Sequence, residues 1–526
     1  MEPTSSALSM TSRYFLAVAV VAWGASFQFY SYGIVNPVES LLRGWINQTY
    51  VDRGWAGAEG LSSTAMTLLW SLLTSSMSIG GFLGCTLTRP LAERAGRRNG
   101  LILNGLVNVA AAVCELSSKW LRSPELLILG RLVLGANMGI ASGLAPLYLT
   151  EITPIRYRGA AGTAHMVAVA FGDWFSLLMG LPALLGTAGL WPLAFAFPGL
   201  PALALCLLLP CLPESPRFLL LRRGERKAAE RAVRTFVRAD DGGADSVVEE
   251  LRSEAEKIYA DRLDDSSNPL NGVGVWHLMT SRKRHLRRAL LVAILTMVAQ
   301  QFTGCSAVFA YSTDMFQHTG LPLATAQYAT VALGIVYFLC VLPTPYLVER
   351  LGRRTLALLQ AAGCLVALCL LSLCTYLGQS VGSVAALVLY MAVYGVGSPV
   401  AWLIGSELFG QRERAAAVTV TTFTAWFLAF LSSICYLPLQ QTVGAALSFL
   451  PFIIVLAFSF VGLYFILPET KNKSVDEITM ELRRRTHTVR ADTPPDSASP
   501  PLRDLQPLIL NGKKNGSYGT LNGGSY

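Results

Sequence analysis

The chain alternates long apolar runs with short polar loops. A helix needs about 20 apolar residues to cross the hydrocarbon of a bilayer. Twelve runs reach this length, near residues 14–36, 65–88, 98–118, 124–148, 159–183, 190–212, 289–312, 325–347, 355–377, 384–408, 415–437 and 446–467. The pattern predicts an all-α membrane protein with twelve transmembrane helices, six in each half of the chain.

Three charged signatures occur twice along the chain at nearly the same spacing. The first and second copies are residues 93–98 and 349–354 (Glu-Arg-x-Gly-Arg-Arg), Glu151 with Arg158 and Glu407 with Arg414, and Pro213-Glu214 and Pro468-Glu469. The copies lie 256 positions apart, to within one residue (93 to 349). A fixed spacing of unrelated signatures indicates a duplicated half, so we expect both halves to have the same architecture.

Composition and charge fix the protein class and the orientation. Hydrophobic residues make up 52% of the 526 positions and charged residues only 14%, which excludes an ordinary soluble domain. The short loops on one side carry eleven arginines, whereas the loops on the other side carry four Lys or Arg residues. Positive loops stay in the cytoplasm, so both termini are expected there. The net charge of +9 then reflects topology and gives no reason to expect nucleic acid as a partner.

These elements divide the chain into five expected parts. They are a cytoplasmic N-terminus (1–13), a six-helix bundle (14–212), an intracellular helical insert (213–288), a second six-helix bundle (289–467) and a disordered cytoplasmic tail (468–526). The insert ends in a basic cluster at 282–288, where anionic lipid headgroups could bind. A simple flank that stops translocation explains this cluster equally well.

Cysteine positions and polar residues outside the helices give little sign of catalytic chemistry. The ten cysteines fall in or beside apolar runs, without disulfide or zinc spacing, and no nucleophile and base pattern is evident. We therefore expect no enzymatic activity, no cofactor and no metal. Asn47-Gln48-Thr49 in the first outer loop is a glycosylation acceptor if that loop enters the lumen. An unused sequon is the alternative, because such triplets are common.

Asp173 is a carboxylate in the middle of an apolar run, seven residues after Met166 and so nearly on the same helix face. A charge at the membrane centre costs about 2.5 to 3.5 kcal/mol on insertion scales, so such residues usually face water or a partner. Asp173 is a candidate proton-coupling residue. A structural hydrogen bond to a neighbouring helix is the competing interpretation.

At these residues the chain resembles the sugar porters of the major facilitator superfamily, and among them the animal facilitative glucose and fructose transporters (solute carrier family 2). The resemblance covers nearly all of residues 14–480 and includes Gly130-Arg131, Pro213 to Arg217, Gln300-Gln301 and Pro468 to Lys471. It implies two six-helix bundles around a central cavity that opens alternately to either side. It also implies that cytoplasmic salt bridges hold the outward-facing state. Their residues here are Arg97, Arg98, Glu151, Arg158, Glu214, Arg353, Arg354, Glu407 and Arg414.

The amides of Gln300 and Gln301 are the best candidates for sugar ligands, because an amide offers two donors and one acceptor to hydroxyl groups. Hydrogen bonding between helices is the competing role. The resemblance further implies that Trp402 and Trp426 line the cavity and that Tyr311 is a gate residue. Ordinary packing is the alternative for all three.

Four positions depart from the glucose carriers. Met166 stands where those carriers have a sugar-binding Gln, and Ser306, Tyr337 and Ala425 stand where they have Asn. The expected function is facilitated transport of a hexose such as glucose or fructose. Transport of an organic anion such as urate, proton-coupled transport and a non-transporting nutrient sensor remain alternatives. Proton-coupled relatives carry an acid in the first helix, and none occurs here.

The tail carries two sequences that resemble sorting signals. Asp504 to Ile509, with Leu508 and Ile509, resembles an acidic dileucine signal, and Tyr518 to Leu521 resembles a tyrosine-based signal. Both kinds are read by clathrin adaptors. We therefore expect a multi-pass protein of the plasma membrane that cycles through endosomal or lysosome-related compartments.

Overall fold

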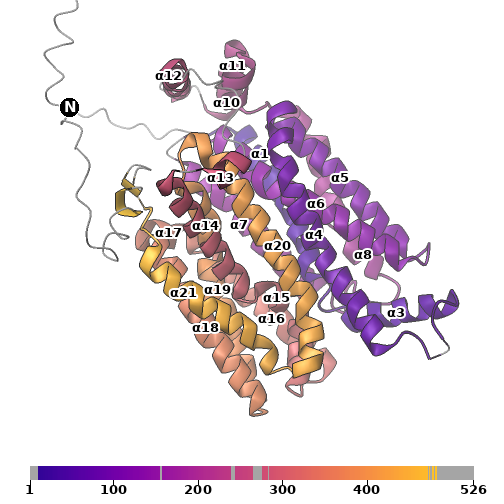
Figure 1. Ribbon diagram of the computed structural model, residues 1–526. Coiled ribbons are helices and arrows are strands. Elements are labelled where there is room, and N and C mark those ends of the chain that lie inside the picture. The colour runs from indigo at the N-terminus through magenta and orange to yellow at the C-terminus, as the bar shows by residue number, and fades with distance from the viewer. Residues whose placement is uncertain are drawn as a thin grey trace, which may run out of the picture. The chain divides into compact units, whose positions relative to one another are not determined.

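The structure is a computed structural model that describes residues 10–57, 59–154, 157–238, 243–264, 275–281, 283–471, 473, 477–478 and 480–482. Every regular element within these ranges is a helix, and two isolated β-bridges are the extended pairings among them. Figure 1 shows the long helices running side by side. The expectation of an all-α architecture is confirmed.

The first half contains the helices of six spans. They are α1 (Ser12–Ser26), η1 (Phe27–Phe29) and α2 (Tyr30–Gly33), then α3 (Glu39–Asp52) in the first outer loop, α4 (Ser63–Arg94), α5 (Arg97–Ser118), α6 (Pro124–Ile152), α7 (Arg158–Met179), and α8 (Trp191–Ala196) with α9 (Gly199–Leu208) and η3 (Leu209–Cys211). The helix α3 occupies much of the loop between the first two spans.

The second half repeats this order. Its helices are α14 (Arg284–Phe302) with α15 (Cys305–His318), α16 (Leu323–Val341) with α17 (Thr344–Leu351), α18 (Arg353–Tyr376), α19 (Ser380–Glu407), α20 (Gln411–Val443), and η6 (Leu447–Phe449) with α21 (Leu450–Ile466).

Among the described residues, eleven helical segments are long and apolar enough to cross a membrane. The position of the fifth span is filled by a shorter apolar helix, Ala164–Met179, within α7. Together these segments occupy the twelve positions that the sequence predicts. The protein is therefore a multi-pass membrane protein.

Glycines allow α4 and α6 to pack backbone against backbone. A Cβ atom added to Gly80 would lie 2.0 Å from the carbonyl oxygen of Leu132, and one added to Gly135 would lie 2.1 Å from that of Met77. No side chain fits at such distances. Small residues at helix contacts are expected in a membrane, where lipid provides no hydrophobic drive for association.

The first span of each half is interrupted near its middle. In the first half, the 3₁₀ segment η1 separates α1 from α2. In the second half, Gly304 separates α14 from α15 with a φ of +85°, a backbone conformation that favours glycine. The duplicated halves thus share a discontinuous first helix.

Short helices lie between the halves in the sequence. They are α10 (Pro216–Phe218), η4 (Leu219–Arg223), α11 (Arg226–Phe236), α12 (Gly243–Asp264) and α13 (Val275–Thr280). Figure 1 shows α10, α11 and α12 grouped at one end of the long helices, with α3 at the opposite end. The hydroxyl of Thr11, which caps α1, donates to the carbonyl of Thr235 at 2.6 Å and so ties the first span to α11.

Candidate functional site

The first charged signature forms a network at the start of α5, on the side of the first half that is predicted to face the cytoplasm. The Arg97 guanidinium binds Glu151 at 2.9 Å. The Glu214 carboxylate accepts hydrogen bonds from the backbone N–H groups of Arg97 at 3.1 Å and Arg98 at 2.9 Å. These groups are the unsatisfied donors at the start of α5, so Glu214 caps this helix. Ser215 donates its hydroxyl to Glu151 and closes the network.

The second half builds the same network from the second copy of each signature. Arg353 binds Glu407 at 3.1 Å. Glu469 accepts from the N–H groups of Arg353 at 2.9 Å and Arg354 at 3.1 Å, and so caps α18. Thr470 donates its hydroxyl to Glu407, as Ser215 does to Glu151. The repeated spacing in the sequence therefore corresponds to a repeated structure.

The ion pairs described here each join residues of one half. The guanidinium of Arg98 donates to the carbonyl of Leu212 at 3.0 Å, and that of Arg354 donates to Tyr464 at 2.8 Å. Arg414 donates to the carbonyl of Phe409 at 3.4 Å. The side chain of Arg158 lies outside the described part of the structure. A role of these residues in holding one conformation of the carrier stays a prediction.

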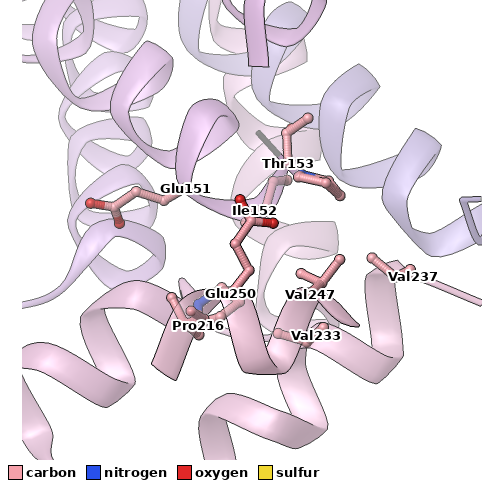
Figure 2. Close-up of a pocket in the computed structure, with 10 residues that line it drawn as sticks. Glu151, Ile152, Thr153, Pro216, Val233, Val237, Val247 and Glu250 are labelled. Atoms are coloured by element: carbon pink, nitrogen blue, oxygen red, sulfur yellow. The ribbon is translucent and has the colours of Figure 1, made fainter. Parts of the chain in front are cut away.

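A small cavity lies beneath the network of the first half, between the end of α6 and the short helices. Figure 2 shows residues that line it, among them Glu151, Thr153, Pro216 and Glu250. Its volume is about 30 Å³. A site of that size has room for water but is far too small for a sugar.

The two adjacent glutamines have different surroundings. Gln300 is hydrogen-bonded at both ends of its amide inside the second half: its nitrogen donates to the Tyr394 hydroxyl at 3.2 Å, and its oxygen accepts from Gln360 at 2.7 Å. Gln301 has a single weak partner, the thiol of Cys305 at 3.5 Å. The structure thus gives Gln300 the role of a bond between helices and leaves the amide nitrogen of Gln301 available.

The break after α14 adds donors beside Gln301. Because Gly304 ends one helix and Cys305 begins the next, the first N–H groups of α15 have no acceptor within their own helix. Ser306 lies in this first turn and is buried. Gln301 and the N–H groups at the start of α15 together form a cluster of polar groups at the break between α14 and α15.

Trp426 lies at the contact between the halves. Its ring packs against Gly81 of α4 and lies 6.1 Å from the ring of Phe29. The indole nitrogen is buried without a hydrogen-bond partner among the described residues. Trp402 and Met166 are half-buried. His165, next to Met166, is buried and hydrogen-bonded to Ser26 at the break of the first span.

Hydrogen bonds join the two halves at the outer side. The Tyr311 hydroxyl lies 2.8 Å from that of Thr74, and the Asn36 amide donates to the carbonyl of Phe309 at 2.7 Å. Gln327 donates to the carbonyl of Pro37 at 2.6 Å. We call these contacts, together with the side chains around Tyr311, the outer gate. The name follows the gating role predicted for Tyr311, and in this structure these contacts join the two halves.

Asp173 is buried on α7, which packs against α16 of the other half. Tyr337 lies on α16, the helix of the second half against which α7 packs. Tyr337 also packs against Phe309, with ring centroids 5.1 Å apart. Asp173 is therefore a buried carboxylate on a helix that packs against the other half.

Asn47 lies on α3, and its side-chain oxygen accepts a hydrogen bond from the N–H of Leu61 at 2.8 Å. The hydroxyl of Thr49 is bonded to the carbonyl of Trp45 at 2.8 Å. The sequon is thus part of a folded outer helix. Its glycosylation stays a prediction.

Some residues that form hydrogen bonds between helices at these sites were not identified from the sequence. Gln360 is a lone amide in an apolar helix, and this signal could have revealed it. Asn36 precedes a proline in the first outer loop, and nothing nearby in the sequence indicates its partner Phe309. The candidate signals at Asp504, Leu508, Ile509, Tyr518 and Leu521 lie outside the described residues.

Comparisons with known proteins agree with this arrangement. The model of the sugar (and other) transporter family matches residues 17–482. The chain is 33% identical over 482 residues to solute carrier family 2, facilitated glucose transporter member 1 of Gallus gallus, covering 90% of this chain and 94% of that protein. It is 32% identical over 471 residues to member 5 of Equus caballus, covering 88% and 90%.

Solved structures share the fold. The partially occluded inward-open form of the xylose transporter XylE from E. coli superposes with a TM-score of 0.70 at 20% identity, over 88% of this chain and all of that one. The proton:xylose symporter XylE bound to 6-bromo-6-deoxy-D-glucose gives 0.70 at 21% identity, over 90% and 99%. These likenesses establish the major facilitator fold.

Proposed function

Because the chain belongs to the sugar (and other) transporter family, we propose that it is a facilitative carrier of hexoses such as glucose or fructose that works by alternating access. The protein is a membrane-embedded sugar transporter and not an enzyme. Its substrate is therefore a small sugar.

The observation that carries the proposal is the pair of breaks at matching places in the two halves. Discontinuous helices near the midplane form the substrate sites of many secondary transporters, because their free backbone groups can bind polar ligands. One break here lies at η1, beside Ser26 and His165, and the other lies at Gly304, beside Gln301.

The chemistry near the second break suits a sugar. The unengaged amide nitrogen of Gln301 and the N–H groups at the start of α15 can donate to hydroxyl oxygens. The Trp426 indole adds one donor and a flat apolar wall for the carbon face of the ring. We place Gln301, Ser306, Trp402, Trp426 and Met166 around the sugar, and Gln300 in a supporting position.

The outer gate supports the transport cycle. Tyr311 of the second half bonds to Thr74 of the first, and opening to the outside must break this bond. The halves otherwise meet through apolar and aromatic side chains such as Phe82 and Phe427, with ring centroids 6.1 Å apart. Such contacts can slide without leaving charges unpaired.

The test is uptake by purified protein in proteoliposomes. Glucose, fructose and urate are compared with and without an imposed pH gradient. We expect a hexose to equilibrate and not to accumulate. Saturable uptake of urate alone would contradict the proposal, and uptake of none of the three by folded protein would favour a sensor.

Proton-coupled transport is the second candidate, and it rests on the position of Asp173 between the halves. If Asp173 couples transport, the parent protein accumulates sugar when a proton gradient is imposed, and Asp173→Asn only equilibrates it. A parent protein that never accumulates sugar excludes coupling and leaves Asp173 a role in binding or packing.

We further propose that the carrier resides in the plasma membrane and cycles through endosomal or lysosome-related compartments. Support comes from the two signals in the tail, which resemble those that clathrin adaptors read. Membrane lipids are the other expected partners, at the basic cluster that precedes α14.

A further inference from the structure

Two carboxylates from opposite halves lie at the outer gate. Glu39 begins α3 in the first half, and Asp314 lies on α15 in the second half, one turn beyond Tyr311. The side chain of Glu39 is 13% exposed and that of Asp314 is 22% exposed. The negative charge of Asp314 contributes to raising the pKa of Glu39, so the two carboxylates repel each other across the contact between the halves.

The groups around this pair are few. Arg43 binds Glu39 at 2.8 Å from the same helix. Asp314 accepts from the Gln440 amide at 2.9 Å and lies 3.5 Å from the ring of His318.

The other helices at the gate add little charge. Tyr311 of α15 and Tyr436 of α20 stack with ring centroids 5.3 Å apart. Both lie within electrostatic range of the Glu39 charge. Toward the gate, α4 presents Thr67 and Trp70, which do not titrate. Arg43 is thus the one permanent cation of the described residues beside two acids.

We propose that Glu39 is a proton-binding site of the outer gate, and that closing the gate takes up a proton from the outside solution. The inference rests on the proposed alternating-access function. In the open gate, Glu39 is hydrated and separated from Asp314. In the closed gate it is shielded from water and faces Asp314, so a proton on Glu39 removes the repulsion between the halves.

The electrostatics of the closed gate agree with this assignment. Burial raises the pKa of Glu39 to about 8. The positive charge of Arg43 opposes this rise, and the negative charge of Asp314 adds to it. A hydrated glutamate has a pKa of about 4.3. A group that binds its proton more tightly in the closed form favours closing at low pH. This advantage is complete below the open-form pKa and is lost as the pH rises through the closed-form pKa of Glu39.

Between these limits, each unit of external pH changes the ratio of closed to open gate by up to about tenfold. The proton enters from the outside and leaves to the outside when the gate reopens. The site therefore makes the carrier sensitive to external pH without coupling sugar flux to a proton gradient. An acidic exterior holds the outer gate closed.

The experiment measures gate opening in the absence of sugar. Ser71 of α4 is buried beside Tyr311 of the gate, so Ser71→Cys reports opening to a membrane-impermeant thiol reagent added outside. Labelling rates are compared in this background with and without Glu39→Gln at pH 6 and pH 8. The ratio of the two rates cancels the intrinsic pH dependence of the thiol, and protein without Ser71→Cys gives the background from native cysteines.

Glu39→Gln mimics a permanently protonated Glu39, so the two proteins should label equally only below the open-form pKa, and at pH 6 the protein that retains Glu39 should already label faster. From pH 6 to pH 8 the ratio of its labelling rate to that of Glu39→Gln should rise at least about fivefold, because deprotonation of Glu39 makes its gate open more often. Asp314→Asn should give an intermediate ratio, since Asp314 supplies only part of the effect. Asp52→Asn removes a charge from the other end of α3 and should leave the ratio at one.

A ratio of rates that stays the same from pH 6 to pH 8 overturns the proposal. The proposal is also overturned if Glu39→Gln and Asp52→Asn change the pH dependence of the labelling rate equally. The pH dependence would then reflect general surface charge. Since no sugar is present, a different substrate would leave these rates unaffected. Failure of the hexose proposal is thereby distinguished from failure of the gate proposal.

Discussion

Replacing Gln300 and Gln301 in turn by Leu separates a structural glutamine from a binding glutamine. Leu is close to Gln in size, so packing is largely retained and hydrogen bonding is lost in both variants. Without Gln300, the amide of Gln360 and the hydroxyl of Tyr394 lose their partner in a buried site. Each group left unsatisfied costs about 1 to 3 kcal/mol, so Gln300→Leu should destabilise the protein by about 2 to 6 kcal/mol.

Gln301→Leu should leave stability nearly unchanged, because the Cys305 thiol is a weak partner. It should instead reduce sugar flux. Each hydrogen bond lost to the substrate weakens binding by about 0.5 to 1.5 kcal/mol. Two such bonds, about 1 to 3 kcal/mol together, correspond to roughly a 5-fold to 150-fold loss.

The assay combines thermal unfolding in detergent with initial hexose uptake in proteoliposomes, normalised to the amount of folded carrier. We expect a lower unfolding midpoint for Gln300→Leu and an unchanged midpoint with low flux for Gln301→Leu. The reasoning is refuted if Gln301→Leu retains flux within about twofold of the parent, or if the two variants lose stability equally.

Other predictions concern the ends of the molecule. Arg97→Ala or Arg353→Ala should bias the carrier toward inward-facing states; unchanged labelling of outer cysteine probes would show that these arginines serve topology and the local network only. Asn47→Gln should abolish a glycosidase-sensitive shift in gel mobility, and a parent protein without that shift would contradict use of the sequon. Leu508→Ala combined with Ile509→Ala should raise the surface fraction in microscopy or biotinylation, whereas an unchanged distribution would exclude the dileucine signal.

The fold could be predicted from the sequence because the bilayer allows few solutions. Backbone groups in hydrocarbon must be satisfied within their own segment, so an apolar run of sufficient length becomes a helix. The duplicated signatures also predicted related networks at the cytoplasmic ends of both halves. The bond between Gln300 and Gln360 could not be predicted, however, because the two residues lie 60 positions apart in the sequence, and the role of Gln300 toward the sugar stays a prediction. Pairing between helices is set by helix rotation, which apolar runs do not encode.

The inner and outer sides of the carrier also differ in how far their contacts can be predicted from the sequence. On the inner side, Glu214 and Glu469 repeat one capping arrangement, so the duplication alone indicates their equivalence. On the outer side, Asn36 bonds to Phe309 and Glu39 faces Asp314, and neither pair has a counterpart related by the repeat among the described contacts. Opening of the inner side can therefore follow common features of the duplicated fold. The response of the outer gate to the surrounding solution depends on single positions of this chain, which only their spatial proximity reveals.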